Sequence, residues 1–425
     1  MKLKYNVEDR LPAGALAVYS LQWFVLCIAV VATSVFVAQG TPEERLFYAQ
    51  KLFAVMGIAG LIQVIWGHRL PLVVGPAAVL LVGVMSALSS SATTDGIYTS
   101  IAIGGVITTL LTIGNTMRYI QRLFTPRIIV VILMLIAFTL TPTISQKLIF
   151  AHNPTLDPHI LHDQHIFGLV FALIGTFAMV ALNRTLKGVA KSLIIPVALI
   201  VGSVAFFALF GMPEKCGSAA SLDNMFIGSI TLDWGLILAF VVCYIALIIN
   251  DIGSIESLGS MLQSDNMPRR MRRGIAITGI MNIVSGAMGV LGPVNYSMSP
   301  GVIASTGCAA RRALIPATIA LTLCALSPDI IWVLTAIPAP VIGVILLYLM
   351  GTQLAASFEM LQSSKSAETF ADALTLGLPL MVAMLFQLMP PGIAPKVVEP
   401  LMGNGFAMGV ITVLILEHIV NRRKA

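Results

Sequence analysis

The fold is decided by the stretches LVVGPAAVLLVG at residues 72–83 and YSMSPGVIASTG at residues 296–307. Each stretch places a proline beside small residues near the middle of a short apolar run. Proline lacks a backbone N–H and glycine tolerates unusual dihedral angles, so both favour a few residues of non-helical chain. We therefore expect a short extended break and a half-helix in each stretch, with a simple packing kink as the alternative.

The remainder of the chain is apolar enough to be solvated by lipid. Hydrophobic residues make up 57% of the 425 residues, charged residues only 10%, and the mean hydropathy is +0.94. A helix needs about 20 apolar residues to cross a bilayer, where no water satisfies an open backbone group. The expected fold class is an all-α integral membrane protein with fourteen spans. They cover roughly residues 13–38, 47–67, 71–90, 94–117, 126–146, 166–183, 187–210, 228–255, 269–289, 294–308, 311–328, 329–352, 368–389 and 396–420.

The two interrupted stretches are the third and the tenth of these spans, so they occupy equivalent places in two halves. Repeat 1 covers residues 13–210 and repeat 2 covers residues 228–420. Because seven is an odd number, the second half must enter the membrane inverted. Irregular backbone at membrane depth survives only when it is buried in protein or lines a wet cavity. The paired breaks therefore predict the binding site of a membrane transport domain.

Basic residues predict the orientation of the chain. With the N-terminus inside, 20 of the 25 Lys and Arg residues fall on the cytoplasmic side, as the positive-inside rule describes. Both termini are therefore predicted to be cytoplasmic, in a multi-pass protein of the inner (cytoplasmic) membrane. The net charge of +6 needs no nucleic-acid partner, because the cluster at residues 269–273 serves as a topology anchor.

The eighth predicted span carries polar residues where an apolar helix is expected. Asn250 and Asp251 are adjacent, and such groups are costly inside a bilayer, which makes them functional candidates. Asn250 shares a helix face with Gly253 and Ser254, whereas Asp251 points about 100° away. An amide offers both a donor and an acceptor to a heterocyclic ring edge, and Asp251 is the candidate for carrying a coupled proton.

At these residues the sequence resembles the nucleobase/ascorbate transporter family, the nucleobase-cation symporters of xanthine/uracil permease type. That family's first span carries a Gln-His pair, which is Gln22 and Trp23 here. The family's substrate-binding glutamate of span eight falls on Asn250. The family's tenth-span signature is an acid or Gln, then Asn-x-Gly, four further residues, Thr, and Arg or Gly. Gly301, Thr306 and Gly307 fit this signature, whereas Met298 and Ser299 depart from it. The third-span stretch of the family corresponds to residues 75–78, so a ring-stacking aromatic is missing at Ala78.

The resemblance implies a core subdomain, residues 13–117 and 228–328, that moves against a gate subdomain, residues 126–210 and 329–420, in a homodimer. It implies a secondary transporter that carries a purine or pyrimidine nucleobase by alternating access, coupled to H⁺. An anion carrier of the sulfate type and an uncoupled facilitator remain the alternatives. No nucleotide, metal or hydrolase motif is found, so neither a cofactor nor an enzyme is expected. The candidate substrate site comprises Gln22, Trp23, Gly75, Pro76, Ala77, Ala78, Asn250, Gly253, Ser254, Tyr296, Ser297, Met298, Ser299 and Gly301.

Overall fold

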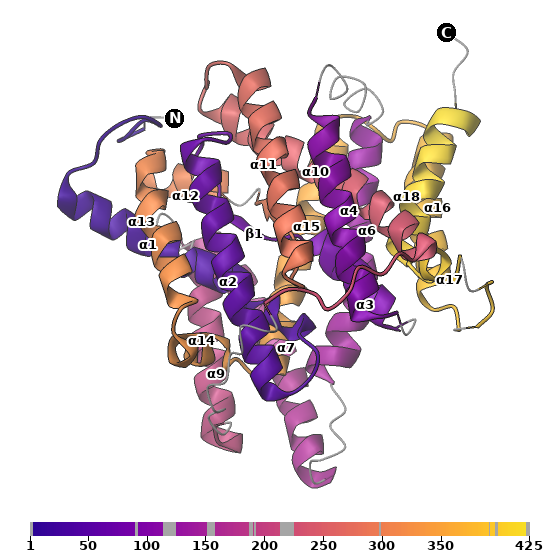
Figure 1. Cartoon of the computed structure of the whole chain (residues 1–425), viewed down its shortest axis with the longest axis horizontal. Helices are drawn as coiled ribbons and strands as arrows, with labels where there is room; N and C mark the ends of the chain where they lie inside the picture. The colour runs from indigo at the N-terminus through magenta and orange to yellow at the C-terminus, as the bar shows by residue number, and fades with distance from the viewer. Residues whose placement is uncertain are drawn as a thin grey trace.

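The computed structural model describes residues 3–89, 92–113, 125–150, 158–186, 190, 193–212, 225–296, 299–390, 392–395 and 398–421. Helices lie side by side in one body, with α16 and α18 at one edge, α1 and α13 at the other, and α4, α10 and α11 between them (Figure 1). The elements of the first half are α1 (Ala13–Ala32), η1 (Val35–Val37), α2 (Pro42–Ile65), β1 (Val74–Pro76), α3 (Ala78–Ser89), α4 (Thr94–Leu111), α6 (Pro126–Thr143), η2 (Ile144–Ile149), α7 (Pro158–Thr185) and α9 (Ile194–Phe210).

The second half contains a similar succession of helices around one short strand. Its elements are α10 (Trp234–Met261), α11 (Met267–Ala287), β2 (Pro293–Asn295), α12 (Ser299–Thr306), η4 (Arg311–Ala313), α13 (Leu314–Cys324), α14 (Pro328–Thr335), α15 (Ala339–Ser363), α16 (Phe370–Gln387), α17 (Glu399–Met402), α18 (Gly405–Ile415) and η5 (Leu416–Val420). In each half the third apolar segment is a strand followed by a half-helix.

Local sequence signals set the ends of several helices. Thr41 and Glu44 form a capping box at the start of α2, and Thr369 and Asp372 form another at the start of α16. The Asp233 carboxylate caps α10 by accepting from the backbone N–H groups of residues 235 and 236. Such caps satisfy N–H groups that have no partner inside their own helix.

Eight of the described helices are long and apolar enough to cross a membrane, or nine if the bent pair at residues 311–335 is one span. The protein is therefore a multi-pass membrane protein. Three shorter apolar helices, at residues 78–88, 194–210 and 405–420, accompany them. The full set of fourteen spans in two inverted repeats stays a prediction.

Two of the predicted span boundaries are wrong. The expected span at 329–352 is divided, because α14 ends at Thr335 and α15 runs from Ala339 to Ser363. The preceding span ends at Cys324, and the two helical pieces around residues 325–327 are bent by 105°. The physical reason lies in the prolines at positions 328, 338 and 340, which start helices readily but do not continue them.

The expected breaks in the third and tenth segments are present, and they pair with each other. Strands β1 and β2 run antiparallel, with Val74 opposite Asn295 and Pro76 opposite Pro293. Hydrogen bonds from Tyr296 N to Val73 O and from Ala77 N to Gly292 O extend the pairing at both ends. The non-helical backbone is thereby satisfied inside the protein, as a low-dielectric surrounding requires.

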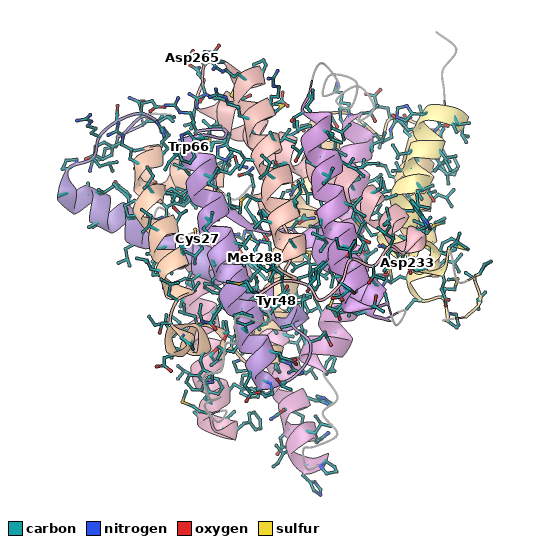
Figure 2. The ribbon with its side chains drawn as sticks, viewed as in Figure 1. Cys27, Tyr48, Trp66, Asp233, Asp265 and Met288 are labelled. Carbon is teal, nitrogen blue, oxygen red and sulfur yellow. The ribbon has the colours of Figure 1, made fainter. Side chains whose placement is uncertain are left out.

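Helices α2 and α11 run in opposite directions (Figures 1 and 2). Trp66, which follows α2, and Asp265, which precedes α11, lie in the upper part of the view, whereas Met288, which follows α11, lies lower, close to Tyr48 of α2 (Figure 2). Small residues allow close helix packing at the centre. A Cβ atom on Gly105 of α4 would lie 2.6 Å from the backbone nitrogen of Ile283 of α11. Such backbone-to-backbone approach is typical of helix pairs in membranes.

Candidate functional site

A cavity of about 240 Å³ lies beside the start of α3 and the residue that follows β2, against the long helices α1, α6, α10 and α15. Three predicted site residues line it: Asn250 from α10, Ala78 at the start of α3, and Tyr296 directly after β2. The paired breaks therefore lie beside one shared cavity. Its other lining residues are Val30, Thr33 and Ser34 of the first segment, Leu81 of α3, Leu133 and Leu140 of α6, and Leu346, Leu349, Met350, Thr352, Gln353 and Ala356 of α15.

Tyr296 supplies the aromatic ring of the cavity. Its hydroxyl donates to Pro76 O at 2.6 Å, and its backbone N–H donates to Val73 O, so both strands hold it in place. The ring packs on Gly75, where an added Cβ would lie 2.9 Å from the ring carbon Cε2 and would also clash with Val30. The aromatic group that position 78 lacks thus comes from the opposite strand.

Asn250 presents a carboxamide to the cavity from α10, one residue before the buried Asp251. The residue is half-buried, and no hydrogen bond to its side chain exists among the described residues. An amide at this depth can donate from its nitrogen and accept at its oxygen. Asn250 is therefore free to bind both a donor and an acceptor of a ligand.

Asp251 points away from the cavity and into a fully buried network behind β2. Its side chain is 0% exposed. One carboxylate oxygen accepts from the backbone N–H and from Nδ2 of Asn295, at 3.0 and 2.6 Å, and the other accepts from the Thr278 hydroxyl at 2.7 Å. Thr278 in turn accepts from Gln63 Nε2 at 3.0 Å. These bonds tie α2, α10, α11 and β2 together.

His68, in the loop after α2, completes the network on its other side. Its Nδ1 accepts from Leu70 N, so Nε2 carries the proton and donates to Asn295 Oδ1 at 2.9 Å. Burial lowers the pKa of His68 to about 4, and the hydrogen bond to Asn295 opposes that shift. The imidazole is therefore neutral at physiological pH.

Several predicted site residues lie outside the cavity lining. Trp23 is 2% exposed and packs in the apolar core, and Gln22 is also buried. Gly253 is exposed and has no neighbour within 4 Å of a Cβ position, whereas the buried Ser254 hydroxyl has no hydrogen-bond partner among the described atoms.

The remaining predicted residues belong to the strands and to the start of α12. Ser299 Oγ accepts from Val73 N at 2.9 Å and so joins α12 to β1. Gly75 and Pro76 form β1, and Ala77 is paired to Gly292. Gly301 lies within α12, and Ser297 and Met298 lie outside the described residues.

Sequence reasoning missed the contribution of α15. Gln353 and Thr352 are the polar residues of this helix that line the cavity, and the Gln353 amide donates to Leu133 O of α6 at 3.1 Å. The available signal was a glutamine inside an apolar helix. Gln353 follows Met350, Leu349 and Leu346 by three, four and seven residues, so these four side chains share one face of the helix.

A second cavity of about 640 Å³ lies next to the first, toward the end of α2 that is opposite Trp66. Met85 and Leu88 continue the face of α3 that carries Ala78, and Ile342 continues that of α15. Arg45 is the charged residue among its described lining. Helices α3 and α15 therefore contribute to both cavities, at positions about one or two helical turns apart.

Comparisons with known proteins agree with this architecture. The model of the xanthine/uracil permease family, described as "Permease family", matches residues 14–392. The uric acid permease PucJ of Bacillus subtilis (strain 168) is 23% identical over 405 residues, which are 91% of this chain and 87% of that protein. The xanthine permease XanQ of Escherichia coli (strain K12) is 21% identical over 355 residues, 79% of this chain and 75% of that protein.

Two of the solved structures with a similar fold are a bicarbonate transporter and an anion transporter. The transmembrane domain of the cyanobacterial bicarbonate transporter BicA superposes with a TM-score of 0.63 at 15% identity, covering 97% of this chain and 99% of that domain. Murine Slc26a9, an anion transporter in the inward-facing state, gives a TM-score of 0.61 at 13% identity, covering 99% of this chain and 70% of that one. At these identities the likeness concerns the fold alone. The family match decides the family: the chain is a member of the xanthine/uracil permease family, whose members are membrane transporters and not enzymes.

Proposed function

We propose that this protein is a secondary transporter that carries an uncharged purine or pyrimidine base across the cytoplasmic membrane. The observation that carries the proposal is the cavity shared by Asn250, Tyr296 and the start of α3. Its volume of about 240 Å³ lies below the roughly 300–1,000 Å³ typical of pockets for drug-sized ligands, which suits one small ring system. A free amide and an aromatic ring are the groups that recognise such a base.

Alternating access is the mechanism we propose for transport. The cavity lies between helices α1, α3 and α10 of the predicted core and helices α6 and α15 of the predicted gate. A relative movement of the two groups would open the cavity to one side and then to the other, as in transporters built from inverted repeats. We place both termini in the cytoplasm on the charge bias, and we expect a homodimer from the family resemblance.

Proton coupling is assigned to Asp251 as part of the same proposal. A carboxylate without a cationic partner is costly at membrane depth, and protonation removes that cost. Asp251 accepts its hydrogen bonds from Asn295, the residue before Tyr296, so its charge is one residue away from the cavity wall. A change in its protonation would therefore act on the position of β2.

The proposal is tested by uptake in cells that lack their own base permeases. Cells that express the protein are given radiolabelled uracil, xanthine, hypoxanthine or adenine, and initial rates are measured against concentration. We expect saturable uptake of at least one base, which falls when the proton gradient is dissipated. No saturable uptake of any of the four bases would overturn the proposal.

Anion transport is the second candidate, because the similar solved structures named above are anion transporters. The described lining of the 240 Å³ cavity contains no Lys or Arg to pair with an anion. Burial of an unpaired charge costs several kcal/mol, roughly. Bicarbonate or sulfate that displaced a bound base from the purified protein would favour this second candidate.

A further inference from the structure

The cavity has a polar group on its gate side as well as on its core side. Gln353 of α15 and Asn250 of α10 both line it, and these helices belong to the two groups of elements that border the cavity. Along α15 the other lining side chains are apolar or small, apart from Thr352. Gln353 is therefore the one amide that the described gate side offers to a ligand.

The orientation of the Gln353 amide follows from its partner. Leu133 O is a backbone carbonyl and can only accept, so the amide atom that lies 3.1 Å from it must be Nε2, which donates. The other atom, Oε1, has no hydrogen-bond partner among the described residues. Gln353 thus offers an acceptor to the cavity while its donor is held by α6.

Most hydroxyl donors around the cavity are already used. Thr33 donates to Val30 O, Thr352 donates to Leu349 O, and Tyr296 donates to Pro76 O. The described lining contains no charged side chain. A ligand therefore meets two amides, the Ser34 hydroxyl and apolar surface, which favours an uncharged molecule.

We infer that Gln353 is a second substrate-binding residue, whose Oε1 accepts a hydrogen bond from a ring N–H of the bound base while Asn250 binds another edge of the same ring. This inference rests on the proposed function and deepens it. It names the substrate class as a neutral heterocyclic base that donates a ring N–H toward α15. The base would thus contact both groups of elements, α10 through Asn250 and α15 through Gln353.

The test is a cycle between protein variants and methylated ligands. The radiolabelled base that the wild type takes up best is compared with its N-methyl derivatives as competitors, in the wild type and in Gln353→Met, which is close in shape. We expect one methyl position to weaken binding to the wild type about tenfold, the effect of one neutral hydrogen bond. In Gln353→Met the parent base should bind about tenfold more weakly, and that same methyl group should cause no further loss.

Two controls make the outcome specific. Gln362→Met makes the same substitution at an exposed position of α15 outside the cavity lining, and this variant should bind the base like the wild type. Gln353→Glu keeps an acceptor at this position, and when protonated its side chain can donate to Leu133 O. If the acceptor is what binds the base, the affinity of this variant for the base should fall no more than about threefold. If Gln353→Met does not fold, Gln353→Leu, which also removes the acceptor, carries the same cycle. A folded Gln353→Leu protein that binds the base as tightly as the wild type would overturn the inference.

Failure of the inference is distinguishable from failure of the proposed function. If the wild type binds a base and Gln353→Met binds it equally well, or if every methyl derivative loses the same factor in both proteins, the inference is wrong and the function stands. If the wild type binds none of the four bases, the proposed function is wrong and the inference falls with it.

Discussion

Asn295 Nδ2 donates to Asp251 Oδ1 at 2.6 Å, and this bond joins strand β2 to helix α10 immediately behind the cavity. The backbone N–H of Asn295 donates to the same oxygen, and Asn295 Oδ1 accepts from His68. The next residue, Tyr296, lines the cavity. The residue that binds the buried Asp251 carboxylate, Asn295, is thus the direct chain neighbour of Tyr296, which supplies the ring of the proposed site.

Substitution of Asp251 separates its structural role from its proposed proton. Asp251→Asn can keep an oxygen for Asn295 and donate from its nitrogen to Thr278 Oγ1, so we expect a folded protein. Asp251→Ala leaves two buried donors of Asn295 without an acceptor, at a cost of about 1–3 kcal/mol each. Thermal unfolding in detergent measures the difference.

The same Asp251→Asn variant tests the coupling. Because a carboxamide cannot titrate, uptake by this variant should lose the dependence on external pH that the wild type shows. An Asp251→Asn protein with the pH profile of the wild type would remove Asp251 as the proton carrier, whatever its effect on the rate.

Sequence reasoning predicted the two breaks and singled out Asn250 because these signals are local. Proline and glycine reveal a break wherever they occur, and Asn250 stands out in an apolar helix. The bonds from Asp251 to Asn295, 44 residues apart, and from Asn295 to His68, 227 residues apart, depend on how the two halves pack, which no local pattern specifies. Gln353 was missed for the same reason, since helical spacing defines a face but not what it contacts.

Asn250→Ala should reduce substrate binding without reducing stability. The side chain has no hydrogen bond among the described residues, so its loss leaves no protein group unsatisfied. We expect binding about tenfold weaker, the value of one neutral hydrogen bond, and an unchanged unfolding temperature. Equal binding of a radiolabelled base by the variant and the wild type would exclude Asn250 from the site.

Gly75→Ala should disturb the cavity through Tyr296. The added methyl group would clash with Val30 and lie 2.9 Å from the Tyr296 ring, so one of them must move. Overpacking of this kind costs about 1–3 kcal/mol. Gly253→Ala is the matched control, because nothing lies within 4 Å of its Cβ position and alanine favours the helix. We expect reduced base uptake and a lower unfolding temperature only for Gly75→Ala, and a normal Gly75→Ala protein would contradict the packing.

His68 predicts how stability depends on pH. Its pKa is about 4 in the folded protein, because of burial, and near 6.5 in an unfolded chain. Between these values the unfolded state binds more protons, so the free energy of unfolding rises with pH and falls as the pH drops from about 6.5 toward 4. The unfolding temperature of the purified protein should therefore decrease over that interval. His68→Gln can still donate to Asn295 but does not titrate, so it should flatten this part of the profile. His162→Gln, at an exposed histidine of α7, should keep the slope of the wild type. A slope that persists unchanged in His68→Gln would show that other groups cause it.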